Sequence, residues 1–84
     1  MVTVEVTPAA LADLSRLPKV IQERAWKVVR RLRAWPTVSG VVALSGNLAG
    51  WYRIRTGDYR IRIRVIGDRL IVDRIGHRKD VYED

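Results

Sequence analysis

The chain has 84 residues, which is enough for one domain with a two-layer core but too few to enclose a large substrate pocket. Cysteine is absent, which excludes disulfides, thiolate zinc sites and cysteine nucleophiles. Sixteen Lys and Arg residues against nine Asp and Glu give a net charge of +7, and this excess favours a polyanionic partner, most often nucleic acid.

Neither a targeting signal nor a membrane span is apparent. The N-terminal residues lack a basic region followed by an apolar run, and no stretch approaches the roughly 20 apolar residues that cross a bilayer. We therefore expect a cytoplasmic protein with no membrane partner.

The N-terminal part of the chain predicts a strand followed by a short helix. Residues 2–7 alternate valine with polar residues, which is typical of a half-buried strand. Thr7 and Pro8 then suit the N-cap and the first position of a helix. Leucines spaced three apart give this helix an apolar stripe, and Pro18 requires it to end.

A longer helix is predicted between Pro18 and Pro36. Its apolar residues form one stripe at helical spacing: Ile21, Ala25, Val28, Val29, Leu32 and Trp35. Arginines near its C-terminus complement the helix dipole, which is a sufficient structural explanation for some of them, so this helix alone does not indicate a binding site.

Residues 37–50 contain three glycines and predict a loop. Loops of this length are often functional, although this one could simply return the chain across the sheet. Val41, Val42 and Leu44 are its expected anchors.

The segment WYRIRTGDYRIRIRV, residues 51–65, predicts a β-hairpin with a two-residue turn at Gly57-Asp58 or Thr56-Gly57. In either register, one face carries Tyr52, Ile54, Tyr59, Ile61, Ile63 and Val65. The other face carries Trp51, Arg53, Arg55, Arg60, Arg62 and Arg64. A further strand over residues 70–76 places Leu70 and Val72 on the core face and Asp73 on the arginine face.

The predicted fold is α+β, with one domain over residues 1–84 in the order β-α-α-β-β-β. A mainly antiparallel sheet packs on two N-terminal helices and presents its arginines outward. Arginines that face one another across strands repel, and Asp73 can neutralise only one or two of them, Arg62 or Arg64. Either an anionic partner binds this face, or the arginines merely keep it soluble.

Few residues could support acid–base chemistry. No Ser-His-Asp arrangement, metal-ligand spacing or phosphate-binding glycine loop is present, so we expect no metal and no cofactor. RNA, however, supplies its own 2′-OH nucleophile, so a protein that cleaves it needs to orient that group, stabilise charge and move protons. Tyr82 could stack on a base and His77 could transfer a proton, unless His77 is only structural.

Two segments, LSGNLAGWYRIRTGDYRIRIRV and LIVDRIGHRKDVYED, together resemble the RelE branch of the RelE/ParE toxin superfamily. The resemblance covers essentially the whole chain. It implies the toxin of a type II toxin–antitoxin system that cleaves messenger RNA in the ribosomal A site, inhibits translation and needs no metal.

The resemblance also implies roles for individual residues. Arg53 and Arg55 would contact RNA and help to activate the 2′-OH, Arg60 would stabilise the phosphate, and Arg78 would act on the leaving group. Tyr82 would position the target nucleotide, and we hypothesise that His77 is an auxiliary acid or base. The expected RNA-binding residues around them are Trp51, Arg62, Arg64 and Lys79. Because arginine is a poor general base, the base itself is not identified.

The implied partners are a cognate antitoxin, in a hetero-oligomeric complex, and the ribosome with its mRNA. Two alternatives keep the fold and change the function: a ParE-like inhibitor of DNA gyrase, or a module that binds RNA or ribosomes without cleaving.

Overall fold

The computed structural model describes residues 2–44 and 50–77. Within these ranges the elements, in chain order, are β1 (Thr3–Val6), α1 (Pro8–Ser15), α2 (Lys19–Arg31), the 3-10 turn η1 (Leu32–Ala34), β2 (Val41–Ala43), β3 (Trp51–Thr56), β4 (Tyr59–Ile66) and β5 (Arg69–His77).

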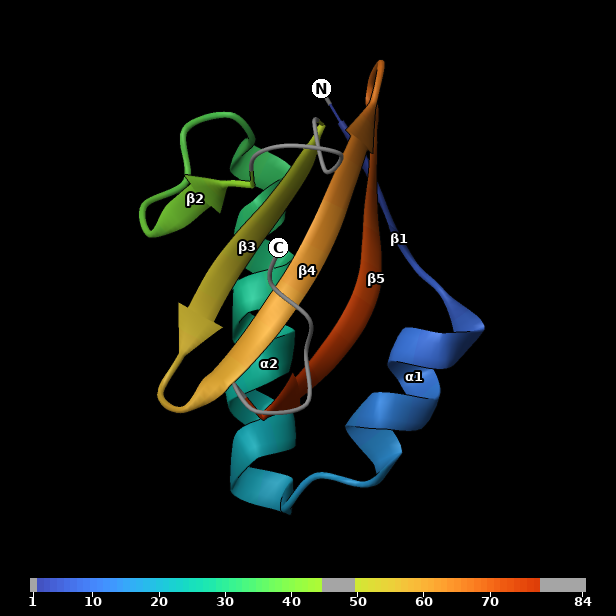
Figure 1. Ribbon diagram of the computed structural model, residues 1–84, viewed down its shortest axis with the longest axis vertical. Helices are drawn as coiled ribbons and strands as arrows, with labels where there is room; N and C mark the ends of the chain where they lie inside the picture. The colour runs from blue at the N-terminus through green and yellow to red at the C-terminus, as the bar shows by residue number, and fades with distance from the viewer. Residues whose placement is uncertain (1, 45–49, 78–84) are drawn as a thin grey trace.

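The strands form one sheet in the order β1-β5-β4-β3-β2. β1 runs parallel to β5, and all other neighbours are antiparallel. In Figure 1, α2 lies behind the sheet, and α1 lies beside β5. The predicted α+β fold, with a mainly antiparallel sheet packed on two helices, is confirmed.

The region expected to be a loop contains an additional edge strand, β2. Val41 pairs with Ile54, and Ala43 pairs with Tyr52. A run of three apolar residues between glycine-containing segments is too short to show a period of two, which is why the pattern did not predict a strand. Of the three expected anchors, Leu44 is buried, with 9% of its surface exposed, and Val41 packs against the core, but Val42 is 45% exposed and is not an anchor.

The apolar stripe predicted for α2 is confirmed, but the leucine stripe predicted for α1 is wrong in part. Leu11 is 47% exposed and Leu17 lies beyond the end of α1, because residues spaced three apart drift round a helix of about 3.6 residues per turn. α1 contributes Ala10 and Leu14 to the core. The buried residues of α2 and η1 are Ala25, Val28, Val29 and Leu32. The inner face of the sheet completes the core with Ile54, Ile61, Ile63, Leu70, Val72 and Ile75.

Two-residue turns join the three long strands. Thr56 pairs with Tyr59, so the loop is Gly57-Asp58 and the first of the two predicted registers is correct. Gly57 has φ +62°, a left-handed value that a turn of this length requires at its first position and that glycine adopts without strain. Gly67, with φ +59°, plays the same part between β4 and β5.

A β-bulge interrupts β5 at Asp73. Ile63 pairs with Val72 while Arg62 pairs with Arg74, so Asp73 is an extra residue on β5. An extra residue reverses the inward and outward alternation beyond it. As a result Ile75 points into the core, with 2% of its surface exposed.

Candidate nucleic-acid interface

The hairpin register brings the predicted arginines together on the outer face of the sheet. Arg53 lies opposite Arg62, and Arg55 lies opposite Arg60. Trp51 faces Arg64 at the other end of β3. We call this set, Trp51, Arg53, Arg55, Arg60, Arg62 and Arg64, the arginine face.

Among the described residues, contacts of two kinds offset the repulsion on this face. Asp73 accepts two hydrogen bonds from Arg62, at 2.6 Å from Nη2 and 3.1 Å from Nε, as the sequence led us to expect. The Trp51 ring lies 4.9 Å from the guanidinium carbon of Arg62 and 5.2 Å from that of Arg64. These distances are typical of cation–π contacts, so the Trp51 ring stabilises both guanidinium groups.

The arginines differ greatly in exposure. Arg55 and Arg64 are exposed, whereas only 8% of the surface of Arg60 is exposed. Burying a guanidinium costs free energy. An arginine needed only for solubility would extend into solvent, so the burial of Arg60 favours a specific role for this residue.

His77 lies at the end of β5, opposite Tyr59. Their ring centroids are 5.6 Å apart, in an edge-to-face arrangement. Tyr59 belongs to the row of β4 that includes Ile61 and Ile63, so His77 is on the opposite side of the sheet from the arginine face. Without the bulge at Asp73, the alternation of β5 would have placed His77 among the arginines.

A cleft of about 420 Å³ opens where β5 ends beside the turn between the helices. Arg62 and Arg74 line it from the sheet, and Arg16 lines it from the end of α1. The remaining lining residues are Asp13, Leu17, Pro18, Tyr59, Ile75, Gly76 and His77. The sequence singled out neither Asp13 nor Arg16 nor Arg74, because nothing in the spacing shows that α1 meets the far end of β5.

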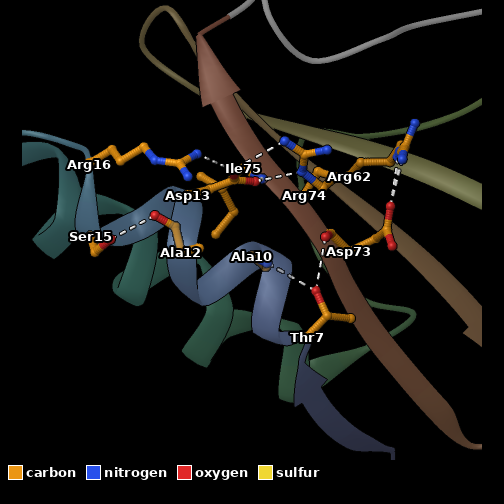
Figure 2. A network of polar contacts seen from close by, with 10 residues as sticks. All are labelled: Thr7, Ala10, Ala12, Asp13, Ser15, Arg16, Arg62, Asp73, Arg74 and Ile75. Carbon is orange, nitrogen blue, oxygen red and sulfur yellow. Dashed lines mark hydrogen bonds and ion pairs between the residues drawn. The ribbon is translucent and has the colours of Figure 1, made fainter.

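Asp13 connects α1 to β5 within this cleft, as Figure 2 shows. Its carboxylate accepts hydrogen bonds from the backbone N–H of Ile75 at 2.9 Å and from Nε of Arg74 at 2.8 Å. Burial alone would raise the pKa of Asp13, but these hydrogen bonds, together with the charges of Arg74 and Arg16, hold it below its ordinary value. The carboxylate is therefore ionised at neutral pH.

Three expected site residues, Arg78, Lys79 and Tyr82, lie outside the described residues. Within residues 2–44 and 50–77, no three His, Asp or Glu side chains are grouped so that they could hold a metal ion. None of the helices in the same ranges is long and apolar enough to span a bilayer.

The family model that matches this chain is the ParE toxin of the type II toxin–antitoxin system parDE, over residues 4–82. The chain belongs to the RelE/ParE superfamily of toxins. Toxin RelE3 of Methanocaldococcus jannaschii is 32% identical to it over an alignment of 74 residues, with 84% of each chain covered.

Solved structures agree with this assignment. The toxin–antitoxin complex RelBE2 of Mycobacterium tuberculosis contains a chain that is 28% identical, with a TM-score of 0.79, covering 90% of this chain and 96% of the other. A chain of the RelB–RelE antitoxin–toxin complex of Methanococcus jannaschii is 27% identical, with a TM-score of 0.77, covering 93% and 98%. This chain thus spans nearly the full length of both relatives.

Proposed function

We propose that this toxin is a ribosome-dependent endoribonuclease that cleaves messenger RNA in the A site and so inhibits translation. The observation that carries the proposal is the arginine face, where Arg53 and Arg55 of β3 lie opposite Arg62 and Arg60 of β4. Two paired rows of guanidinium groups suit a phosphate backbone, since each can donate a fork of hydrogen bonds to phosphate oxygens. The curated relative named RelE3 supports the same branch of the superfamily.

The proposed reaction is an in-line transfer within the RNA. The 2′-oxygen loses its proton and attacks the neighbouring phosphorus, the bond from phosphorus to the 5′-oxygen breaks, and that oxygen gains a proton. The products are a 2′,3′-cyclic phosphate and a 5′-hydroxyl. Arg53, Arg55 and Arg60 would stabilise the negative charge that develops on the phosphate oxygens.

The proposed site also includes residues outside the described part of the chain, whose roles are those that the resemblance to the RelE branch implies. Arg78 would act on the leaving group, and Tyr82 would hold the target nucleotide by stacking. Trp51, Arg62, Arg64 and Lys79 would bind the RNA around it. The hypothesis that His77 is an auxiliary acid or base is not part of this proposal, because His77 lies opposite Tyr59 on the other side of the sheet from the arginine face.

We further propose a cognate antitoxin as the resting partner. Two of the relatives were solved as toxin–antitoxin complexes. An acidic or amphipathic antitoxin segment would neutralise the arginine face and compete with RNA for it, giving a hetero-oligomer that cannot cleave.

A second candidate function is inhibition of DNA gyrase, as in the ParE branch. The specific observation in its favour is the family model itself, which describes the ParE toxin of parDE. In that case the arginine face would be a binding surface for a protein or for DNA and would need no nucleophile.

A toeprint assay on translating ribosomes tests the proposal. Wild type should produce new mRNA ends in the A site. Arg55→Ala, at an exposed position, should slow cleavage about 10- to 100-fold by removing one charge-stabilising group. Arg60→Lys keeps the buried positive charge but loses the paired N–H donors of the guanidinium group, and it should slow cleavage by a similar factor.

The matched control is Arg33→Ala, which removes one exposed arginine of η1 that is not part of the arginine face. It should cleave like wild type. Intact mRNA with folded, antitoxin-free wild type would contradict the proposal, and a gyrase supercoiling assay would then test the second candidate. Ribosome binding without cleavage would instead identify a non-catalytic module.

A further inference from the structure

The cleft at the end of β5 shares one residue with the arginine face. Arg62 belongs to both: it lies opposite Arg53 in the hairpin and also lines the cleft. Arg74, the partner of Arg62 on β5, lines the cleft beside it. An RNA strand bound along the arginine face could therefore continue over β5 into the cleft, and its phosphates would stay close to arginine side chains.

Among the residues that the structure describes, the mouth of the cleft has one guanidinium more than nearby carboxylates neutralise. Arg62 is paired with Asp73, and Arg74 donates to Asp13 at 2.8 Å. Arg16 also approaches Asp13, but its Nη1 is 3.8 Å from the carboxylate, which is beyond hydrogen-bond distance. Figure 2 shows the Asp13 carboxylate between the guanidinium groups of Arg16 and Arg74.

Arg16 and Arg74 are also accessible from solvent. Their side chains are 74% and 50% exposed, whereas the Asp13 side chain between them is 8% exposed. An anion that enters the cleft would thus meet the two cations before the carboxylate. Guanidinium groups in this arrangement suit a phosphate group.

The interior of the cleft is suited to a ring. Leu17 and Pro18 provide an apolar wall, and Tyr59 with His77 provides two aromatic rings. A volume of about 420 Å³ lies within the range of small-molecule sites. Aromatic side chains hold nucleic-acid bases by stacking without regard to their hydrogen-bonding edges.

We propose that this cleft is a subsite for one nucleotide of the RNA, with the phosphate on the solvent-exposed sides of the Arg16 and Arg74 guanidinium groups and the base against Leu17, Tyr59 and His77. The inference rests on the proposed RNA-cleaving function and names a part of its substrate site. RNA would pass from the arginine face across the bulged end of β5, so the nucleotide in the cleft lies outside the scissile pair.

NMR titration of the isotope-labelled toxin with adenosine monophosphate tests the subsite directly. Saturable shifts should appear at the backbone N–H groups of Leu17, Gly76 and His77. Arg16→Ala should weaken binding about fivefold to tenfold, because one charge-assisted contact with the phosphate is lost. Arg16 is exposed, so this variant should fold normally, and Arg33→Ala is the control with the same change in charge and unchanged affinity.

Two results would overturn the proposal. One is the absence of saturable shifts at the cleft with millimolar nucleotide, and the other is equal affinity in wild type and Arg16→Ala. If purified antitoxin shifts the same signals while the nucleotide does not, the cleft is a protein-binding site instead. The titration is independent of cleavage: wild type that fails to cut mRNA would refute the proposed function, whereas the titration would still decide whether the cleft binds nucleotides.

Discussion

The carboxylate of Asp13 accepts hydrogen bonds from two groups of β5, the backbone N–H of Ile75 and the guanidinium of Arg74. Asp13 is 7% exposed, so its loss would leave the Ile75 N–H without this acceptor in a buried place. Replacing one partner of a buried hydrogen bond costs about 1–3 kcal/mol. The end of β5, which carries His77, depends on this carboxylate for its attachment to α1.

We therefore predict that Asp13→Ala lowers the free energy of unfolding by about 2 kcal/mol at neutral pH. Asp13→Asn keeps an acceptor for the Ile75 N–H and loses the charge, so its loss should be about half as large. Urea denaturation measures both. The control is Glu5→Gln, whose partner Arg69 is solvent-exposed, and the unfolding midpoint should hardly move. Equal stability of Asp13→Ala and wild type would contradict the prediction.

We also predict that the stability contributed by the Asp13 carboxylate depends on pH. The pKa of Asp13 is lower in the folded chain than in the unfolded chain, so the unfolded chain binds more protons in acid. The stability contributed by the carboxylate is fully present above the ordinary aspartate pKa of about 3.9 and is lost as pH falls through the folded value. The stability difference between wild type and Asp13→Asn should thus shrink below about pH 4 and stay constant between pH 5 and 7.

Thr7 connects two elements, the start of α1 and the bulge of β5. Its hydroxyl oxygen accepts a hydrogen bond from the N–H of Ala10 at 3.0 Å and donates to the carbonyl of Asp73 at 3.0 Å. Its own N–H donates to the carbonyl of Val72 at 3.1 Å. The helix cap and the bulge therefore stabilise each other.

Thr7→Ala should lower the free energy of unfolding by about 1–2 kcal/mol, because both the helix cap and the contact with the bulge are lost. Thr7→Ser retains the hydroxyl and should recover most of that loss. Thermal or urea denaturation compares the two. Thr3→Ala, at an exposed position of the adjacent strand β1, controls for the general effect of removing a threonine. A serine variant as unstable as the alanine variant would show that the hydroxyl is not responsible.

Sequence periodicity predicted the elements that repeat a pattern over several residues. The alternation in residues 51–65 predicted the arginine face because a hairpin with a two-residue turn leaves little freedom of register. The bulge at Asp73 could not be predicted in the same way, since a single extra residue leaves no periodic signal. The bulge nevertheless affects the site, because it places Ile75 in the core and His77 on the same side of the sheet as Tyr59.

The cleft also could not be predicted from the sequence, but for a different reason. Asp13 and Arg74 are far apart in the chain, and they meet because α1 packs beside β5. Local patterns describe each element separately, and the contact between the two depends on packing. Only the completed fold shows that Arg16, Arg74 and Arg62 line one cleft.

At the scale of the whole molecule, the net charge of +7 predicts a salt-dependent association with RNA. The logarithm of the binding constant falls with the logarithm of salt concentration, with a slope of about −0.7 per phosphate neutralised on single strands. If the arginine face is the contact surface, Arg55→Ala and Arg64→Ala should each reduce the magnitude of the slope by about 0.7. Fluorescence anisotropy with a labelled, uncleavable oligonucleotide measures it.

Arg33→Ala separates a defined interface from non-specific attraction. This residue is exposed on η1 and is not part of the arginine face, whereas Arg55 and Arg64 are exposed residues of that face on β3 and β4. All three variants reduce the net charge by one, so a long-range effect of charge would weaken binding equally in each. An unchanged slope in Arg33→Ala, beside reduced slopes in the other two, would place the phosphates on the arginine face. A reduction in all three would mean that RNA is attracted by the net charge and has no fixed path across the sheet.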